Sequence, residues 1–319
     1  MKQGCRVFLF LYACCCLPVN AQSPMLIGVV TLAFGPPPTA QGIALGLKNL
    51  GYTEYEDFVI GSRFASGDPN QLDIAYQELL ADGVELFVSV GVQASLSAAR
   101  IVKDKPVVFT TVPDPVKLGL VESYAQPGEN ITGIATLDIE LDNNRLQKFK
   151  QLVPDLQRAL LPYPSNPEFG IERIDRMVDV AQKNGFELKT IEVVDQLHAS
   201  AVLESVADGQ YDGIISVDSP VFNLPGLILD AGQRAGIATM FNASAYVDYG
   251  GFASYGTSFV KTGEQAARLI AQIMTGKKPG SLPIEADQNF EFTVNLTTAK
   301  KLEVGVPPEI LFQATRVVR

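Results

Sequence analysis

The chain is poor in the side chains that most often carry catalysis and metal binding. Its 319 residues include one histidine, four cysteines and no tryptophan. All four cysteines lie within the first 16 residues, so the rest of the chain has no thiol for a disulfide, a zinc site or a cysteine nucleophile. The single histidine, His198, lies in a polar stretch before a predicted helix, which favours an exposed position. These absences argue against an enzyme.

Phosphate-binding motifs and long apolar runs are missing as well. Neither a Gly-x-x-x-x-Gly-Lys loop nor a Gly-x-Gly-x-x-Gly turn occurs, and no Gly-x-Ser-x-Gly elbow is present. Acidic residues outnumber basic ones by 35 to 25, for a formal net charge of −10. An acidic surface repels a phosphate backbone, so the composition excludes nucleic acid as an expected partner.

Residues 1–21 have the pattern of a secretory signal peptide. A basic start is followed by an apolar run, Val7 to Leu17, that is too short to span a bilayer. Cleavage after Ala21 leaves Gln22 as the mature N-terminus. Two alternatives stay open: a lipoprotein signal, in which Cys14 carries the lipid, and an uncleaved tail. The pattern predicts an exported protein, either soluble or tethered at one end.

From residue 25 onward, short apolar runs alternate with amphipathic stretches. Apolar runs bounded by turn residues are typical of buried parallel strands, and strict alternation with helices indicates βαβ units. Strands are expected at Leu26–Leu32, Phe58–Phe64, Glu85–Val90, Pro106–Val112, Ile131–Thr136, Arg158–Tyr163, Glu187–Val193, Gly213–Val217, Gly236–Phe241, Phe252–Ser254 and Phe290–Val294. Helices are expected at Thr39–Leu50, Pro69–Ala81, Gln93–Val102, Val116–Tyr124, Ile171–Asn184, Ala199–Ala207, Pro225–Arg234 and Thr262–Met274. The pattern predicts an α/β fold of two doubly wound, Rossmann-like lobes with a ligand cleft between them.

A series of short motifs follows in order along the chain: Leu50-Gly51-Tyr52, Ala65-Ser66-Gly67-Asp68-Pro69, Val112-Pro113-Asp114-Pro115-Val116, Pro127-Gly128-Glu129-Asn130-Ile131-Thr132-Gly133, Leu152-Val153-Pro154, Ser254-Tyr255-Gly256 and Leu282-Pro283-Ile284. The ordered set resembles the bacterial ABC transporter substrate-binding family that includes tryptophan- and tyrosine-binding periplasmic components. The resemblance implies a type I periplasmic binding fold with a multi-strand hinge. Under this reading the first lobe comprises 22–136 plus about 252–280, and the second comprises 137–251 plus about 284–319.

The resemblance also implies a function. The expected protein is a periplasmic solute-binding component of an ABC importer, which binds a small organic solute between its lobes without a cofactor. An amino acid or an aromatic carboxylate is favoured, and the permease subunits in the inner membrane are the expected partners. One alternative is a ligand-binding sensor of a periplasmic signalling system. Another is a two-lobed enzyme, which the missing cysteines disfavour.

Loops that follow the strands of the first lobe are expected to line the cleft. Phe34 and Gly35 follow the first strand and offer an aromatic face and an accessible backbone. Gly91, Gln93 and Ala94 follow the third strand and lie at the start of a helix. The free N–H groups of such a helix start bind a carboxylate.

Five further residues complete the predicted site. Asp114 and Asp218 each follow a strand and either bind an ammonium group or cap the next helix. Asn242 ends a strand and can both donate and accept a hydrogen bond. Phe222 stacks on a flat ligand or belongs to the core, and Tyr255 either closes the pocket or adjoins the hinge.

Overall fold

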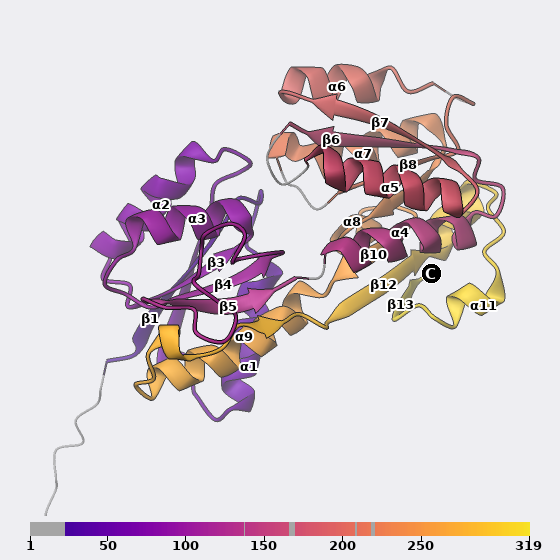
Figure 1. Ribbon diagram of the computed structural model, residues 1–319. Coiled ribbons are helices and arrows are strands. Elements are labelled where there is room, and N and C mark those ends of the chain that lie inside the picture. The colour runs from indigo at the N-terminus through magenta and orange to yellow at the C-terminus, as the bar shows by residue number, and fades with distance from the viewer. Residues whose placement is uncertain (1–22, 137, 166–169, 208, 218–220) are drawn as a thin grey trace, which may run out of the picture.

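The computed structural model describes residues 23–136, 138–165, 170–207, 209–217 and 221–319. The chain forms two α/β lobes, each built around one sheet, and it passes between them three times (Figure 1). The predicted fold class is confirmed. The predicted signal peptide, residues 1–21, lies outside the described residues. Within the described ranges, no helix combines the length and the apolarity needed to cross a bilayer.

The first lobe contains a parallel sheet of six strands in the order β11-β5-β4-β3-β1-β2. Helices cover both faces of this sheet, and for that reason its strands are nearly continuous apolar runs. Helices α1 and α9 pack on one face and α2 and α3 on the other, each pair over its own cluster of buried apolar side chains. The elements are β1 (Met25–Thr31), α1 (Pro38–Asn49), β2 (Phe58–Phe64), α2 (Asn70–Ala81), β3 (Leu86–Val90), α3 (Val92–Ile101), β4 (Val107–Val112), β5 (Ile131–Ala135), α9 (Phe259–Met274) and β11 (Glu285–Ala286).

Helices α1 and α9 lie in very close contact although they are far apart in the sequence (Figure 1). A Cβ atom built on Gly42 would lie 1.9 Å from the carbonyl oxygen of Val260, and one built on Gly263 would lie 2.2 Å from that of Thr39. Only glycine permits this approach of two backbones. The start of α1 is therefore held in place by a late segment of the chain.

The second lobe contains a sheet of seven strands in the order β13-β12-β10-β9-β8-β6-β7, in which only the β10–β12 pair is antiparallel. Two clusters of buried apolar side chains lie on its two faces, one with α4 and α5 and the other with α6 and α7. The elements are α4 (Asp138–Leu152), β6 (Arg158–Pro164), α5 (Ile171–Lys183), β7 (Glu187–Val193), α6 (Gln196–Glu204), β8 (Gly213–Ile215), α7 (Leu224–Ala235), β9 (Ala238–Phe241), α8 (Ala245–Asp248), β10 (Ala253–Thr257), β12 (Phe290–Asn295), α10 (Leu296–Lys301), α11 (Pro308–Leu311) and β13 (Arg316–Val318).

Three crossovers join the lobes, and two predicted boundaries are wrong by one strand each. Strand β10 was expected in the first lobe, but it pairs with β9 and β12 of the second sheet. The residues of β11 were expected in the second lobe and were not predicted as a strand, but they pair with β5 of the first sheet. The crossovers thus lie between β5 and α4, between β10 and α9, and between β11 and β12. A one-dimensional apolar pattern identifies a strand without showing its neighbours, so the pattern could not separate these options.

The helix predicted at 116–124 is absent, and a series of turns replaces it. The amide of Leu118 donates to the Asp114 carbonyl at 3.1 Å, and that of Leu120 donates to the Pro115 carbonyl at 2.9 Å. Gly119 has a φ of 68°, a left-handed conformation that stops a helix after one turn.

Candidate functional site

A cleft of about 550 Å³ lies between the two lobes. The first lobe contributes the loops that follow β1, β3 and β4, which end at the same edge of the parallel sheet. The second lobe contributes residues of α5, of the segment before α7, and of the β9–α8 turn. This is the position where two doubly wound lobes are expected to bind a ligand.

Two helix starts form much of the first-lobe wall. Helix α1 begins after Pro37 and helix α3 begins after Gly91, and neither helix start has a side-chain cap. Pro37, Pro38, Gly91 and Val92 all line the cleft. The first N–H groups of a helix have no partner within it and carry partial positive charge. In α1 these groups begin only at Thr39, because Pro37 and Pro38 carry no N–H, whereas α3 offers them from Val92 onward. This wall is therefore suited to an anionic or hydrogen-bond-accepting group of a ligand.

Two buried threonine hydroxyls lie in the same wall and were not predicted. The Oγ1 atoms of Thr39 and Thr111 are buried and have no hydrogen-bond partner among the described residues. Thr111 has a φ of 60°, unusual for a β-branched residue, at the point where the β4–β5 pairing shifts register. Buried hydroxyls usually have a partner, and strained backbone often marks a functional site. Both threonines are thus candidate ligand contacts that no sequence motif indicates.

The second-lobe wall contributes Arg173, the one charged side chain in the lining among the described residues. Its Nε donates to Oδ2 of Asp142 at 2.7 Å, and its Nη2 donates to Oδ1 at 3.1 Å. The Asp142 side chain is 2% exposed and that of Arg173 is 13% exposed. A bidentate pair of this kind fixes the plane of the guanidinium. Arg173 lies within the helix predicted at 171–184, but nothing in the sequence distinguishes it from the other arginine there, Arg176.

Aromatic rings reach the cleft from both lobes. Phe34 of the first lobe is 48% exposed and Tyr249 of the second lobe is 71% exposed. Tyr246 also lines the cleft, and its ring stacks on Phe241 with centroids 5.0 Å apart. Exposed aromatic rings that face the same opening provide apolar surface for a flat ligand.

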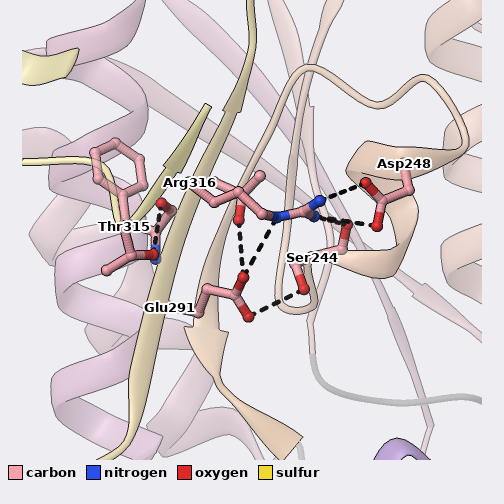
Figure 2. A network of polar contacts seen from close by, with 7 residues as sticks. Ser244, Asp248, Glu291, Thr315 and Arg316 are labelled. Atoms are coloured by element: carbon pink, nitrogen blue, oxygen red, sulfur yellow. Dashed lines mark hydrogen bonds and ion pairs between the residues drawn. The ribbon is translucent and has the colours of Figure 1, made fainter. Parts of the chain in front are cut away.

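A polar network (Figure 2) holds the short helix α8, which carries Tyr246 and directly precedes Tyr249. Arg316 of β13 donates to the two carboxylate oxygens of Asp248 at 2.7 and 3.1 Å, and to the Ser244 carbonyl at 3.4 Å. Glu291 of β12 accepts from the Ser244 hydroxyl at 3.1 Å and lies 3.5 Å from Nε of Arg316. The pKa of Arg316 is raised, chiefly by its hydrogen bond to Asp248. The turn that carries the tyrosines is thereby attached to the C-terminal strands.

The structure brings together six of the ten predicted site residues. Those that line the cleft are Phe34, Gly35, Gly91, Gln93, Ala94 and Asn242. Asp218 lies outside the described residues. The other three, Asp114, Phe222 and Tyr255, have positions elsewhere.

Each of these three residues has a structural contact instead. The Asp114 carboxylate accepts the backbone N–H of Lys117 at 3.0 Å and so caps a turn, the alternative role considered above. Phe222 packs against the apolar cluster beneath α6 and α7. Tyr255 packs on Phe292 and its hydroxyl lies 3.4 Å from Asn144 Nδ2, close to the hinge. Burial raises the pKa of Tyr255.

The chain matches a family model described as ABC transporter substrate binding protein over residues 36–318. A curated relative, the tyrosine-binding protein of Clostridioides difficile, is 23% identical over 265 residues, which are 83% of this chain and 76% of the relative. A solved conserved domain protein of Vibrio cholerae superposes with a TM-score of 0.80 at 24% identity, covering 92% of this chain and 99% of that one. A Streptococcus pneumoniae ABC domain in complex with L-Trp gives a TM-score of 0.78 at 22% identity, covering 93% and 100%.

Proposed function

Because the chain belongs to the ABC transporter substrate-binding protein family, we propose that it is the periplasmic solute-binding component of an ABC importer. Its proposed solute is an aromatic amino acid or a closely related aromatic carboxylate. The observation that carries this proposal is the cleft itself, in which exposed aromatic rings of both lobes face uncapped helix starts and one arginine. Rings provide a surface for the apolar part of such a solute, and the polar groups provide partners for its carboxylate.

The relatives support the same class of solute. One is named for tyrosine and another was solved with L-Trp. The aromatic rings of this cleft, Phe34, Tyr246, Tyr249 and Phe259, are suited to a ring of that size. The proposal extends to this chain what those proteins bind.

Binding and delivery follow from the two-lobed form. A ligand that contacts both walls binds the closed arrangement more tightly than the open one, and it thereby shifts the population toward closure. The proposed permease partner recognises the closed arrangement, so that only the loaded protein delivers its solute. No reaction is catalysed in this scheme.

Solute binding is tested with the chain from Gln22 onward and a panel of Tyr, Trp, Phe, Leu, Glu and arabinose. A ligand at 100 times its Kd adds about 2.7 kcal/mol of apparent stability, which raises the unfolding midpoint by roughly 2–4 °C for each kcal/mol. We expect a shift with one or more aromatic amino acids and none with arabinose. Because the chain lacks tryptophan, the fluorescence of added L-tryptophan reports its binding directly. A response confined to arabinose or glutamate would contradict the proposed solute class.

The importer role requires a separate test. A permease and ATPase of the same organism would be reconstituted in liposomes, with this protein added inside or outside. We expect ATP hydrolysis by the cognate permease and ATPase to rise when the loaded protein is added on the periplasmic face. Stimulation of a sensor kinase instead, with no effect on any such ATPase, would identify the sensor alternative.

A further inference from the structure

We infer that Asp287 is a positioning residue of the hinge, and that it raises the affinity for the solute without contacting it. Asp287 lies in the crossover between β11 and β12, outside the cleft lining. Its role is to hold the three crossovers together where they leave the first lobe. The effect on solute affinity rests on the proposed function and deepens it, whereas the effect on the hinge can be measured without a solute.

The carboxylate of Asp287 is buried without a cation. The residue is 0% exposed, and it forms no ion pair with any residue that the structure describes. Neutral donors hold it instead: Oδ2 accepts from the Thr262 hydroxyl at 2.6 Å, and Oδ1 accepts from the backbone and side-chain N–H groups of Asn289 at 2.9 and 3.1 Å. Burying a carboxylate costs free energy that such bonds only offset. A carboxylate in this place therefore indicates that its contacts have a role beyond packing.

Asp287 links all three crossovers. Its backbone N–H donates at 2.7 Å to the carbonyl of Ala135, the last residue of β5 before the first crossover. Its carboxylate accepts from Thr262 in the first turn of α9, directly after the second crossover. Asp287 itself belongs to the third crossover, where the Asn289 carbonyl accepts from the backbone N–H of Ser258 at 2.7 Å. Three segments far apart in the sequence are thus joined where they leave the first lobe (Figure 1).

This junction restricts where the hinge bends. Closure of two lobes around a solute requires the crossovers to bend. Because Asp287 joins them at the edge of the first lobe, bending is confined to the few residues between this junction and the strands β10 and β12 of the second sheet. A hinge with fewer conformations loses less entropy when the lobes close, so the closed, solute-bound arrangement is favoured. Loss of the junction should therefore widen the range of lobe arrangements and lower the affinity for the solute.

The first experiment measures the range of lobe arrangements without solute. From residue 22 onward the chain has no cysteine, so spin labels can be attached to Gln77→Cys in α2 and Gln182→Cys in α5, two exposed positions on different lobes. Double electron–electron resonance would give the distribution of the distance between the labels. We expect a wider distribution in Thr262→Val, which removes the hydroxyl that donates to Oδ2 of Asp287, than in the labelled chain without this change.

The second experiment measures the affinity for L-tyrosine and L-tryptophan by calorimetry. For Thr262→Val we expect a loss of roughly threefold to tenfold, while Thr262→Ser, which keeps the hydroxyl, should retain most of the affinity. Thr132→Val is the matched control. Thr132 is also buried in the first lobe, and its hydroxyl donates to the Leu282 carbonyl at 2.8 Å, outside the crossovers. The control should lose a similar amount of stability and keep the affinity and the distance distribution of the unaltered chain.

Because a buried carboxylate that loses a donor can destabilise the chain, Asp287→Asn provides a second measurement. The variant keeps the shape of the side chain but removes its charge, so it weakens the bonds from Thr262 and Asn289 and should also widen the distance distribution. In the double variant with Thr262→Val, the loss of binding free energy should be smaller than the sum of the two single losses.

The outcomes distinguish the hinge inference from the proposed function. An unchanged distance distribution in both Thr262→Val and Asp287→Asn would overturn the inference and leave the proposed function standing. Equal widening in Thr132→Val would also overturn it, because the effect would then come from stability alone. A wider distribution with unchanged affinity would contradict the effect on solute binding. If the unaltered chain binds neither L-tyrosine nor L-tryptophan, the proposed function fails, while a distribution that widens in the two variants still supports the junction at Asp287.

Discussion

The two walls of the cleft are built differently. The first-lobe wall consists largely of backbone: a proline-rich loop, two helix starts and two buried hydroxyls. The second-lobe wall includes the long side chains of Arg173 on α5, Tyr246 on α8 and Tyr249 directly after α8, and ion pairs hold both helices in place. Backbone groups are oriented by the fold itself, whereas long side chains need additional partners to stay in one conformation. The buried ion pairs of Asp142 with Arg145 and Arg173 lie in the second lobe, whereas the ion-paired arginines of the first lobe, Arg63, Arg100 and Arg268, are exposed.

The largest expected effect concerns the packing that fixes the first wall. In Gly42→Ala the new Cβ would lie 1.9 Å from the Val260 carbonyl oxygen, so α1 and α9 must separate. We expect the free energy of unfolding to fall by about 1–3 kcal/mol, as measured by urea titration. Gly61→Ala is the matched control, because a Cβ there meets nothing within 4 Å. Equal stability of the two variants would show that the first wall does not depend on this contact.

The next effect concerns the support of the second wall. Arg316→Ala removes the bonds to Asp248 and to the Ser244 carbonyl (Figure 2), and so releases the turn that carries the two tyrosines. We expect the affinity for the aromatic solute to fall roughly threefold to tenfold, or about 0.7–1.4 kcal/mol. The pair is partly exposed, so the unfolding temperature should change little. Arg316→Lys should retain part of the affinity. An unchanged affinity in both variants would show that this network does not contribute to solute binding.

A smaller effect is expected at the Thr39 hydroxyl of the first-lobe wall, where solute affinity and stability should respond differently. Thr39→Val removes a buried hydroxyl that has no hydrogen-bond partner in the described part of the chain, and it keeps the shape of the side chain. We expect the unliganded protein to be as stable as before, while the affinity for the solute falls roughly fivefold, the worth of one hydrogen bond of about 1 kcal/mol. Calorimetry and thermal unfolding of the same sample measure both quantities. A loss of stability with unchanged affinity would show that the hydroxyl stabilises the fold and does not bind the solute.

The smallest expected effect on the free energy of unfolding concerns the Asp73–Arg100 ion pair, which lies outside the cleft lining. Unlike the pairs of Asp142 in the second lobe, it is largely exposed. Hydrogen bonds from Ser97 and then Arg100 hold the pKa of Asp73 below its ordinary value of 3.8. A lowered folded-state pKa stabilises the fold above pH 3.8, and this stabilisation is lost as the pH falls through the lowered pKa. Because the group is exposed, Asp73→Asn should cost about 0.5 kcal/mol or less at pH 7. The difference from the unaltered chain should shrink in urea titrations as the pH falls through the lowered pKa, and a difference independent of pH would contradict its electrostatic origin.

Much of the fold could be predicted from the sequence, because each buried strand is a local apolar run bounded by turn residues. The failures were of pairing: the residues of β10 and β11 do not reveal which sheet they join. The turns at 116–124 were misjudged because Gly119 ends the helical conformation after one turn.

The site was predictable where it is made of backbone. Gly91 and Gln93 follow a strand and begin a helix, so their place at the cleft follows from topology alone. Arg173 was not predictable as a cleft residue, since its orientation depends on Asp142, which lies on another helix. Thr111 was missed because its left-handed conformation arises from the register shift in the pairing of β4 with β5.

The glycine contact between α1 and α9 also has a consequence for the order of assembly. Helix α1 is among the first segments to be synthesised, yet its partner ends at Met274 and the last strand of its sheet ends at Ala286. Five of the seven strands of the second lobe must be made before the first lobe can be completed. Contacts so distant along the chain close slowly. The two lobes are therefore expected to fold as interdependent units, because α1 reaches its final packing only after α9 has been synthesised.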